Sequence, residues 1–262
     1  MNSYNMKYSL PTILFFTVIL STSSFTHAQS ADIYESFSGY TTGQLLTQAG
    51  TGTGTSGAWR NDDKPSAVAT GLTYGSLLTT GGGSSTSPQG RGGILLDSSF
   101  RVDDTTTGDI YLSLLMQSPS GESADAYKAF ELHDGGFNDD FNRKVQIGLN
   151  SSDFRGNGKF GARVATSSAT ENGALANVNA DVNLIVAKFS LSATQDSDSA
   201  TFWFNPEIGA AGDPDLSSGI TLSGLDISYD RFTLANYGGS GNGILIDEIR
   251  FGSTYGSVTP VP

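Results

Sequence analysis

Apolar and polar residues alternate with a period of two in several short segments of this chain, which is the pattern of a β-strand with one buried face. In the segment 110–117, Ile110, Leu112, Leu114 and Met116 share one face of the predicted strand. The segments 144–149 and 159–164 alternate in the same way. The segment 182–191 is apolar on both faces, apart from three polar residues, so we expect it to be a central strand covered on both sides.

Further short apolar runs, bounded by Gly, Asn, Asp and Ser, predict strands at 32–37, 72–78, 93–96, 127–133, 200–205, 226–234 and 244–251. No segment shows the 3.6-residue period of a helix. The pattern therefore predicts an all-β protein of two packed antiparallel sheets. In the last strand, Ile246 and Ile249 are three positions apart, so we expect them in different packing environments. Together with Val186 and Ile147, most of this set should be buried.

Composition and charge exclude several classes of protein. The chain has 262 residues, 14 Lys+Arg against 26 Asp+Glu, and a formal net charge of −12, which disfavours binding to nucleic acid. The absence of cysteine excludes disulfides, thiolate metal sites and cysteine nucleophiles. The 33 glycines favour a turn-rich fold, and the Gly-rich stretches 50–57 and 81–93 are interpreted as long surface loops.

The N-terminus has the layout of a secretory signal peptide. Lys7 precedes an apolar run at 13–20, and small residues follow up to Ala28. The run is shorter than the roughly 20 residues that span a bilayer, so we expect cleavage after Ala28 and no membrane span in the mature chain. A short hydrophobic N-terminal anchor is the alternative. The predicted organisation is a signal peptide at 1–28, one domain at 29–257 and an extended, proline-containing tail at 258–262, in a protein secreted to the bacterial envelope or exterior.

Four segments resemble one family of sandwiches. The last predicted strand contains Ile-Asp-Glu-Ile-Arg-Phe-Gly at 246–252, and the predicted domain opens with Tyr-Glu-Ser-Phe at 34–37. The other two segments are Thr-Ser-Gly-Ala-Trp at 55–59 and Phe-Trp-Phe-Asn-Pro at 202–206. As a set these resemble secreted bacterial laminin-G-like and concanavalin A-like jelly-roll domains. Such proteins often continue after Thr-Pro-Val-Pro into a Pro-Glu-Pro sorting tail, whereas this sequence stops at Pro262. The resemblance implies a two-sheet antiparallel jelly-roll β-sandwich, which hosts lectins, sugar-binding modules and polysaccharide-degrading enzymes alike.

The sequence gives weak support for catalysis. Glycosidases of this fold place two carboxylates together, but their Glu-x-Asp-x-x-Glu pattern is absent, and Glu122, Asp125 and Glu131 are the nearest approach. Asp247 and Glu248 are adjacent, so we interpret them as structural, one fixing a loop end and one facing solvent.

A polysaccharide lyase could pair a histidine with a tyrosine. His133, the one histidine of the mature chain, is a candidate, but no spacing selects Tyr127 or Tyr111 as its partner, and a strand-end structural role is the alternative. We name no catalytic residue.

Loop aromatics and amides are the better candidates for sugar contact, because a flat ring suits a pyranose face and amides suit its hydroxyls. The candidates are Phe137, Asn138, Phe141, Asn142, Asn236, Tyr237, Asn242 and Tyr255. Trp59 is a further candidate, although a structural role is favoured for it. Trp203 is interpreted as a core residue.

Oxygen-rich loops suggest a bound Ca²⁺, which accepts six to eight oxygen ligands. Asp134, Asn138, Asp139 and Asp140 crowd one loop next to two glycines, and Asp134, Asp139 and Asp140 are the first candidates as ligands. Two further acidic groups lie at 97–109 and 213–215. Ordinary turn formation is the alternative for each loop.

The function expected from sequence is a secreted, non-catalytic carbohydrate-binding or surface-adhesion module whose partner is a polysaccharide or cell-surface glycan. An extracellular polysaccharide hydrolase or lyase is the alternative, and a structural matrix protein is the second. A carboxylate pair or a Tyr/His/Arg cluster on one sheet would favour the enzyme. Exposed rim aromatics on a flat sheet would favour binding, and a featureless surface would favour the matrix role.

Overall fold

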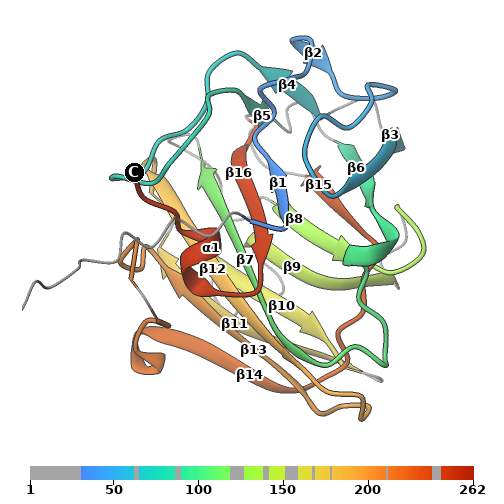
Figure 1. The fold of residues 1–262 in the computed structure, drawn as a ribbon, viewed down its shortest axis with the longest axis vertical. Coiled ribbons are helices and arrows are strands. Elements are labelled where there is room, and N and C mark those ends of the chain that lie inside the picture. The colour runs from blue at the N-terminus through green and yellow to red at the C-terminus, as the bar shows by residue number, and fades with distance from the viewer. Residues whose placement is uncertain are drawn as a thin grey trace, which may run out of the picture.

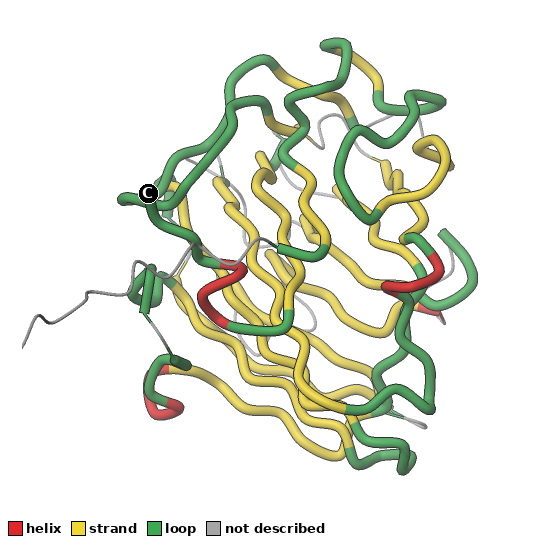
Figure 2. Tube along the Cα trace, viewed as in Figure 1, coloured by secondary structure: helices red, strands yellow, loops and turns green. Residues whose placement is uncertain are grey.

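A computed structural model describes residues 31–61, 65–85, 90–118, 127–137, 142–150, 159–166, 169–177, 179–210, 212–237 and 243–262. Almost all of the regular secondary structure belongs to two antiparallel sheets, joined by long loops, and the few helical turns lie between strands or near the C-terminus (Figures 1 and 2). The predicted signal peptide lies outside the described residues. Within them, no helix is long and apolar enough to cross a membrane.

One sheet has nine strands in the order β14-β13-β12-β7-β16-β5-β4-β2, and β1 also pairs with β16. Its strands are β1 (Ile33–Glu35), β2 (Gly43–Gln44), β4 (Ser66–Val68), β5 (Gly83–Ser85), β7 (Gly108–Gln117), β12 (Val182–Leu191), β13 (Asp198–Phe204), β14 (Gly219–Leu225) and β16 (Leu245–Gly252). The long central pair β7 and β12 is in register over ten residues, from Val182 opposite Gln117 to Leu191 opposite Gly108.

The other sheet has seven strands in the order β11-β10-β9-β8-β15-β6-β3. Its strands are β3 (Thr55–Asn61), β6 (Gly90–Leu96), β8 (Tyr127–His133), β9 (Arg143–Asn150), β10 (Lys159–Ala165), β11 (Thr170–Asn177) and β15 (Arg231–Tyr237). The helical elements named within the described residues are the 3₁₀ turns η1 (Ser98–Phe100) and η3 (Leu216–Ser218) and the short helix α1 (Tyr255–Val258).

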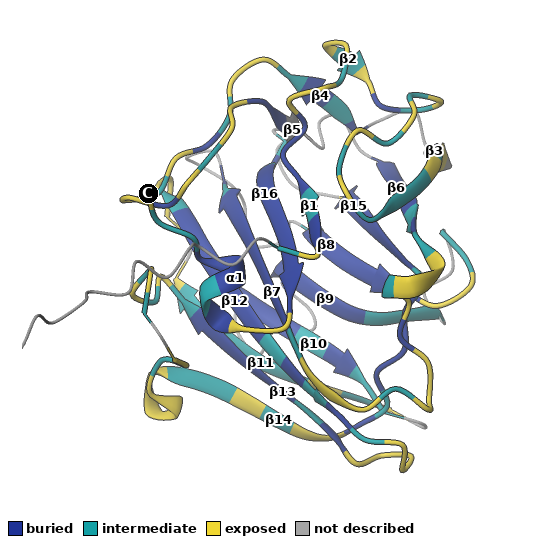
Figure 3. Cartoon of the chain, viewed as in Figure 1, coloured by how far each residue is buried: buried dark blue, intermediate teal, exposed yellow. Residues whose placement is uncertain are grey.

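The inner faces of the two sheets form the main hydrophobic core, to which every second residue of the central strands contributes (Figure 3). A smaller core covers the outer face of the nine-stranded sheet. There Leu184 and Val186 of β12 pack against Leu72, Leu77 and the helix α1. β12 is therefore apolar on both faces because it is covered on both sides, as predicted.

The prediction of a strand at 72–78 is wrong. This segment is a loop that lies over the nine-stranded sheet, and Asp247 holds its start by accepting a hydrogen bond from the Leu72 amide at 2.8 Å. Leu72 and Leu77 are buried by this packing rather than by a strand ladder, whereas Leu78 is exposed. The strands β2, β3, β4, β5, β11 and β14 were not predicted, and the stretches 50–57 and 81–93, which were interpreted as surface loops, contain the start of β3, all of β5 and the start of β6. The strand predicted at 226–234 starts several residues before β15. The predicted extended tail begins inside α1, and its Val258 and Thr259 are buried.

The prediction that Ile246 and Ile249 occupy different environments is also wrong, because both belong to the main core. A β-bulge separates them: Asp247 is opposite Leu115 and Arg250 is opposite Ser113, so β16 has one more residue than β7 over this stretch. Glu248 takes the left-handed conformation, with φ of 54°, and this returns Ile249 to the inner face. The burial predicted for Ile246, Ile249, Ile147 and Val186 is confirmed, although Val186 lies in the smaller core.

Candidate functional site

A polar cluster lies on the outer face of the seven-stranded sheet. Phe130 and Leu132 of β8 point into the main core, so the alternating residues Tyr127, Glu131 and His133 face outward. Strand pairing places Thr233 of β15 on one side of Glu131 and Gln146 of β9 on the other. Non-local pairing thus brings polar residues of three strands into one row across the sheet.

Glu131 is the centre of this cluster and is fully buried. Its Oε2 is 2.9 Å from Arg91 Nε, 3.0 Å from His133 Nε2 and 2.9 Å from the Thr233 hydroxyl, which donates to it. The other oxygen, Oε1, accepts a hydrogen bond from the Tyr127 hydroxyl and one from Arg143 Nη1 at 3.4 Å. Arg143 also donates to the Tyr127 hydroxyl. One carboxylate therefore organises two arginines, a histidine and a tyrosine.

These contacts keep Glu131 ionised. Burial alone would raise its pKa, but the hydrogen bond from His133 and the charges of Arg91 and Arg143 outweigh it and lower the pKa to about 2. For Tyr127, burial and the neighbouring Glu131 carboxylate raise the pKa above its usual value. The tyrosine therefore stays protonated and acts as a donor.

Two polar groups of the cluster are buried without a hydrogen-bond partner among the residues that the structure describes. They are the side-chain amide of Gln146 and Nδ1 of His133. Because His133 Nε2 faces the Glu131 carboxylate, Nε2 is the protonated nitrogen and Nδ1 carries a lone pair in the neutral ring. Unsatisfied polar atoms are rare in protein interiors, so these two groups mark the cluster as a candidate site.

An exposed aromatic side chain borders the cluster. Tyr237, at the end of β15, is 38% exposed and packs edge-on against Tyr127 at a ring-centroid distance of 5.9 Å. The Arg91 guanidinium lies 5.5 Å from the same ring centroid. Tyr127 is itself partly exposed, whereas the Arg143 side chain is only 7% exposed, so the two tyrosines form the solvent-facing side of the cluster.

The structure places the predicted sugar-binding residues in different environments. Tyr237 lies beside the cluster, and Phe137 is partly buried with its ring 4.4 Å from the Arg231 guanidinium. Trp59 is 1% exposed: it donates from Nε1 to the Tyr40 hydroxyl and packs against Phe232, so no face of its ring is open to a sugar. Tyr255 and Asn236 are buried as well. Asn142 is partly buried and its carbonyl accepts from the Asp134 amide, while Asn138, Phe141 and Asn242 lie outside the described residues.

The predicted calcium loop is described only at Asp134, since Asp139 and Asp140 lie outside the described residues. The Asp134 carboxylate is exposed and accepts a hydrogen bond from the Ser228 hydroxyl at 2.9 Å. In the described part of the chain, no group of three or more His, Asp or Glu side chains is placed to hold a metal ion. The calcium site stays a prediction.

His133 and Tyr127 were weighed as a pair from sequence, and Glu131 was considered separately as a carboxylate. Their even separations along one strand put all three on the same face, and this signal could have linked them. Arg91, Arg143, Gln146 and Thr233 carry no comparable signal, because they come from other strands whose register depends on long-range pairing. The histidine does lie at a strand end, but it is buried in a polar network rather than in a turn.

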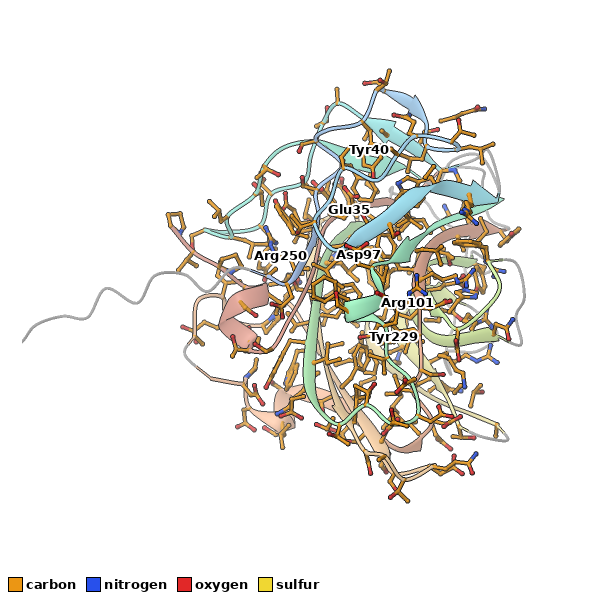
Figure 4. All side chains as sticks on the ribbon, turned by 45° about the vertical axis from the view of Figure 1, so that its right-hand side comes forward. Glu35, Tyr40, Asp97, Arg101, Tyr229 and Arg250 are labelled. Carbon is orange, nitrogen blue, oxygen red and sulfur yellow. The ribbon has the colours of Figure 1, made fainter. Side chains whose placement is uncertain are left out.

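Asp247 and Glu248 form a separate, structural group. The expectation that one of them faces solvent is wrong, since both are fully buried. Asp247 accepts from the Leu72 amide, and Glu248 accepts from the Thr80 amide at 2.9 Å and from the Tyr34 hydroxyl at 2.7 Å. Arg250, labelled in Figure 4, also pairs with Glu248. These carboxylates anchor the two ends of the loop over the nine-stranded sheet.

Two cavities lie away from the cluster. One of about 160 Å³ is lined in part by Asp32, Phe100, Arg101 and Tyr229, of which Figure 4 labels Arg101 and Tyr229. Arg101 donates to the Leu96 carbonyl and so has a structural role. The other, of about 460 Å³, lies beside Trp203 and the acidic segment 213–215. Neither combines an exposed ring with unsatisfied polar groups, so the outer-face cluster is the candidate site.

The two antiparallel sheets, their packed inner faces and their strand order define a concanavalin A-like β-sandwich. Among solved structures, the botulinum neurotoxin serotype D binding domain is similar, with a TM-score of 0.51 and 9% identity over 86% of this chain and 48% of that chain. The receptor binding domain of botulinum neurotoxin mosaic serotype C/D gives 0.50 and 7% over the same shares. The globular domain of T. cruzi calreticulin gives 0.49 and 10% over 86% and 88%.

At these identities the likeness concerns the fold alone, and the chain spans about half the length of the toxin domains. No protein-family model matches the sequence, and no curated protein matches it.

Proposed function

We propose that this protein is a carbohydrate-binding module whose binding surface is the outer face of the seven-stranded sheet. The observation that supports it is the cluster around Glu131, where buried, oriented polar groups lie next to the exposed ring of Tyr237. Carbohydrate sites combine a flat aromatic surface with a few fixed donors and acceptors. Arg143 and Tyr127 supply the fixed groups, and the network around Glu131 orients them before a ligand arrives.

The test is binding of the purified domain to a panel of soluble polysaccharides, followed by affinity electrophoresis and calorimetry. Tyr237→Ala removes the aromatic surface without opening the core, and we expect it to weaken binding by up to about tenfold. Leu216→Ala is the matched control, because Leu216 is 62% exposed and lies on η3 beside the other sheet. Equal binding by the wild type and Tyr237→Ala would remove this face from the proposal, and no binding to any glycan would refute it.

We propose as a second candidate that the same cluster cleaves a uronate-containing polysaccharide by β-elimination. The supporting observation is that Tyr127 and His133 bond to opposite oxygens of one carboxylate and that two arginines contact the same group. An arginine would neutralise the uronate carboxylate, and His133 Nδ1, which is buried in the free protein, would remove the C5 proton once binding exposes it. The C4–O4 bond then breaks, a C4=C5 double bond forms, and the Tyr127 hydroxyl protonates the departing oxygen.

Ultraviolet absorbance of the conjugated, unsaturated product tests this candidate directly. We expect His133→Asn and Tyr127→Phe to abolish product formation while Tyr237→Ala only slows it. Binding of a polyuronate without any unsaturated product would leave the protein as a binding module. A glycosidase mechanism has less support, because Glu131 is the only acidic side chain that the described strands β6, β8, β9 and β15 carry.

We propose further that the protein is exported to the bacterial envelope or exterior, as the signal-peptide pattern at 1–28 suggests. Intact-mass analysis of exported protein should give a chain that begins near Gln29. Retention of Met1 would contradict export by cleavage.

A further inference from the structure

A small pocket opens toward the main core where β1, the start of β7, the end of β16 and the segment 99–106 meet. Its volume is about 160 Å³, and none of its lining residues belongs to the cluster around Glu131. Exposed residues form its mouth, among them Asp32, Ser99 and Arg101 (Arg101 is labelled in Figure 4). The pocket is therefore open to solvent and separate from the proposed carbohydrate surface.

The inner walls of the pocket are apolar and largely aromatic. They are formed by residues that belong to the main core or pack against it: Ile33, Phe100, Val102, Ile110, Tyr229 and Phe251. Apolar cavities of about 150 Å³ stay dry and bind benzene. Aromatic walls add edge-to-face contacts to a bound ring. The size and the walls of this pocket thus suit one six-membered ring.

Tyr229 contributes the polar group of these walls. Its backbone is fixed by two hydrogen bonds with Val102, each of 2.8 Å, and its ring packs between Phe189 and Phe251 at centroid distances of 6.5 and 6.0 Å. The side chain is 1% exposed, yet its hydroxyl bonds to no residue that the structure describes. Burial alone raises the pKa of Tyr229, so the hydroxyl stays protonated. Buried tyrosine hydroxyls usually have a partner, and this one can meet a partner only through the pocket.

The charges at the mouth favour no ion of either sign. Arg101, Asp32 and Asp109 all line the pocket, so both signs are present. Asp109 pairs with Lys188 at 3.0 Å, and Arg101 donates from Nε to the Leu96 carbonyl at 3.0 Å. A monosaccharide would bury several hydroxyls against the apolar walls without partners, at a cost in free energy for each. The pocket therefore suits a neutral ring with a single oxygen.

We propose that this pocket binds a neutral molecule with a single six-membered ring and one oxygen substituent, to which the Tyr229 hydroxyl donates a hydrogen bond. Phenols and cyclic alcohols or ketones form the chemical class that meets these requirements. The ring packs against Phe100 and Phe251, and its oxygen supplies the partner that the described residues do not give Tyr229. The inference is independent of the carbohydrate-binding function, since the two sites share no residue.

Fluorine NMR with two small probes tests the proposal. The probes are 4-fluorophenol and fluorobenzene, which have the same ring and differ by one hydroxyl. The shift and broadening of each fluorine resonance on titration with the protein measure its affinity. We expect 4-fluorophenol to bind about five- to tenfold more tightly, as expected for one added hydrogen bond. Methyl β-glucoside should displace neither probe.

Tyr229→Phe removes the hydroxyl and keeps the ring. The affinity for 4-fluorophenol should fall to that for fluorobenzene, whereas the affinity for fluorobenzene should stay unchanged. Because the hydroxyl bonds to no described residue, the melting temperature should change little, which separates lost binding from lost folding. Tyr74→Phe is the matched control: Tyr74 is partly buried against the smaller core, so the variant removes the same atom far from the pocket and should leave both affinities unchanged.

Ile110→Trp enlarges a partly buried wall residue and narrows the pocket, so it should weaken the binding of both probes. Equal affinities of the two probes for the wild type, or an unchanged preference in Tyr229→Phe, would overturn the inference, because the hydroxyl would then face water rather than a ligand. Absence of binding by both probes, displacement by methyl β-glucoside, or undiminished binding in a folded Ile110→Trp would also overturn it. The polysaccharide panel is a separate readout, in which Tyr229→Phe should behave as the wild type does.

Discussion

At the scale of single residues, the Glu131 carboxylate is the group on which the candidate site depends most. Its ionised form is stabilised by Arg91, Arg143, His133, Thr233 and Tyr127, and each of these side chains is in turn oriented by it. Removing one partner of a buried ion pair costs more than the pair contributes, because the remaining charge is left without compensation.

We therefore predict that Glu131→Gln lowers the free energy of unfolding by about 3 to 5 kcal/mol, since it leaves two buried arginines facing a neutral amide. Chemical denaturation at neutral pH measures the change. Glu171→Gln is the control: it removes an acidic residue from the same sheet, but Glu171 is exposed, so we expect a change within about 0.5 kcal/mol. A loss below roughly 1 kcal/mol in Glu131→Gln would show that the network is not coupled as the distances indicate.

The pKa of Asp247 is shifted in the opposite direction to that of Glu131, and this shift makes the stability of the protein depend on pH. Burial raises its pKa to about 8, although hydrogen bonds from the Leu72 and Glu248 amides oppose the shift. In the unfolded chain an aspartate has a pKa of about 4, so between these values the folded state binds more protons than the unfolded state. The contribution of Asp247 to stability is therefore complete below about pH 4 and is lost as the pH rises to about 8.

The resulting prediction compares the wild type with Asp247→Asn. From about pH 5 to pH 7, the stability of the wild type should fall relative to that of the variant, by at most about 1.4 kcal/mol per pH unit. Other titrating groups, including Glu35, whose pKa burial also raises, are present in both proteins and cancel in the comparison. Parallel stability profiles for the two proteins across this window would contradict the raised pKa.

The residues of the candidate site also show which of their properties can be predicted from the sequence and which cannot. The sequence identified His133 as the one histidine of the mature chain and Tyr237 as a candidate for sugar contact, because residue type alone carries that information. It could not place Arg91 or Arg143 near Glu131, since their proximity depends on pairing between strands that are far apart in the sequence. Trp59 has the chemistry of a sugar platform, and only its burial shows that its ring is unavailable.

At the scale of elements, strands with a clean period of two were predicted well and irregular ones were not. The predicted segments 110–117 and 182–191 correspond closely to β7 and β12, because strict alternation and continuous apolarity are local signals. β14 lacks such a signal: most of its residues are partly or fully exposed, as befits an edge strand. The loop at 72–78 is apolar because it covers a sheet, and a local pattern cannot distinguish that from a strand.

The closing strand β16 gives a prediction of its own. Its bulge returns Ile249 to the same inner face as Ile246, and both side chains are fully buried in the main core. We expect Ile246→Ala and Ile249→Ala each to cost about 2 to 5 kcal/mol in unfolding free energy. Leu222→Ala on the edge strand β14 should cost less, because Leu222 is only partly buried.

Denaturant titrations of the three variants provide the measurement. A loss below roughly 1 kcal/mol at Ile249 with a full loss at Ile246 would mean that the bulge does not restore the inner orientation. The bulge could not be predicted from the sequence, because the adjacent Asp247 and Glu248 are expected to point to opposite faces of a regular strand. Their role as anchors for a distant loop requires the extra residue.

At the scale of the whole molecule, the sandwich separates two surfaces of different character. The outer face of the nine-stranded sheet is covered by the loop at 72–78 and by α1, whereas the outer face of the other sheet carries the polar cluster and most of the basic strand residues. Covering one outer face stabilises the fold, and the candidate site lies on the other. The sequence predicted the two-sheet class, since alternation and the absence of a helical period are sufficient for that, but it did not predict which face would be covered.

The predicted calcium ion would act on the stability of the whole domain. Asp134, Asp139 and Asp140 bring carboxylates together in one loop, and a bound cation would relieve their repulsion and order the loop rather than perform chemistry. If calcium binds only the folded state, an excess of 100 times its dissociation constant adds about 2.7 kcal/mol of stability. For a domain of this size each kcal/mol raises the melting temperature by roughly 2 to 4 °C, so the expected shift is clearly measurable.

Melting curves in excess calcium and in excess EDTA test this prediction. We expect a higher midpoint with calcium, and we expect Asp139→Ala to abolish the difference if the ion lies in this loop. Asp215→Ala is the matched control: it removes an exposed aspartate at η3, whose carboxylate accepts from the Ser217 amide, and it should leave the calcium shift intact. Coincident midpoints in calcium and EDTA would refute the calcium site. A shift that survives Asp139→Ala but disappears in Asp215→Ala would place the ion at the acidic segment 213–215 instead, because a ligand stabilises only the state that retains its binding residues.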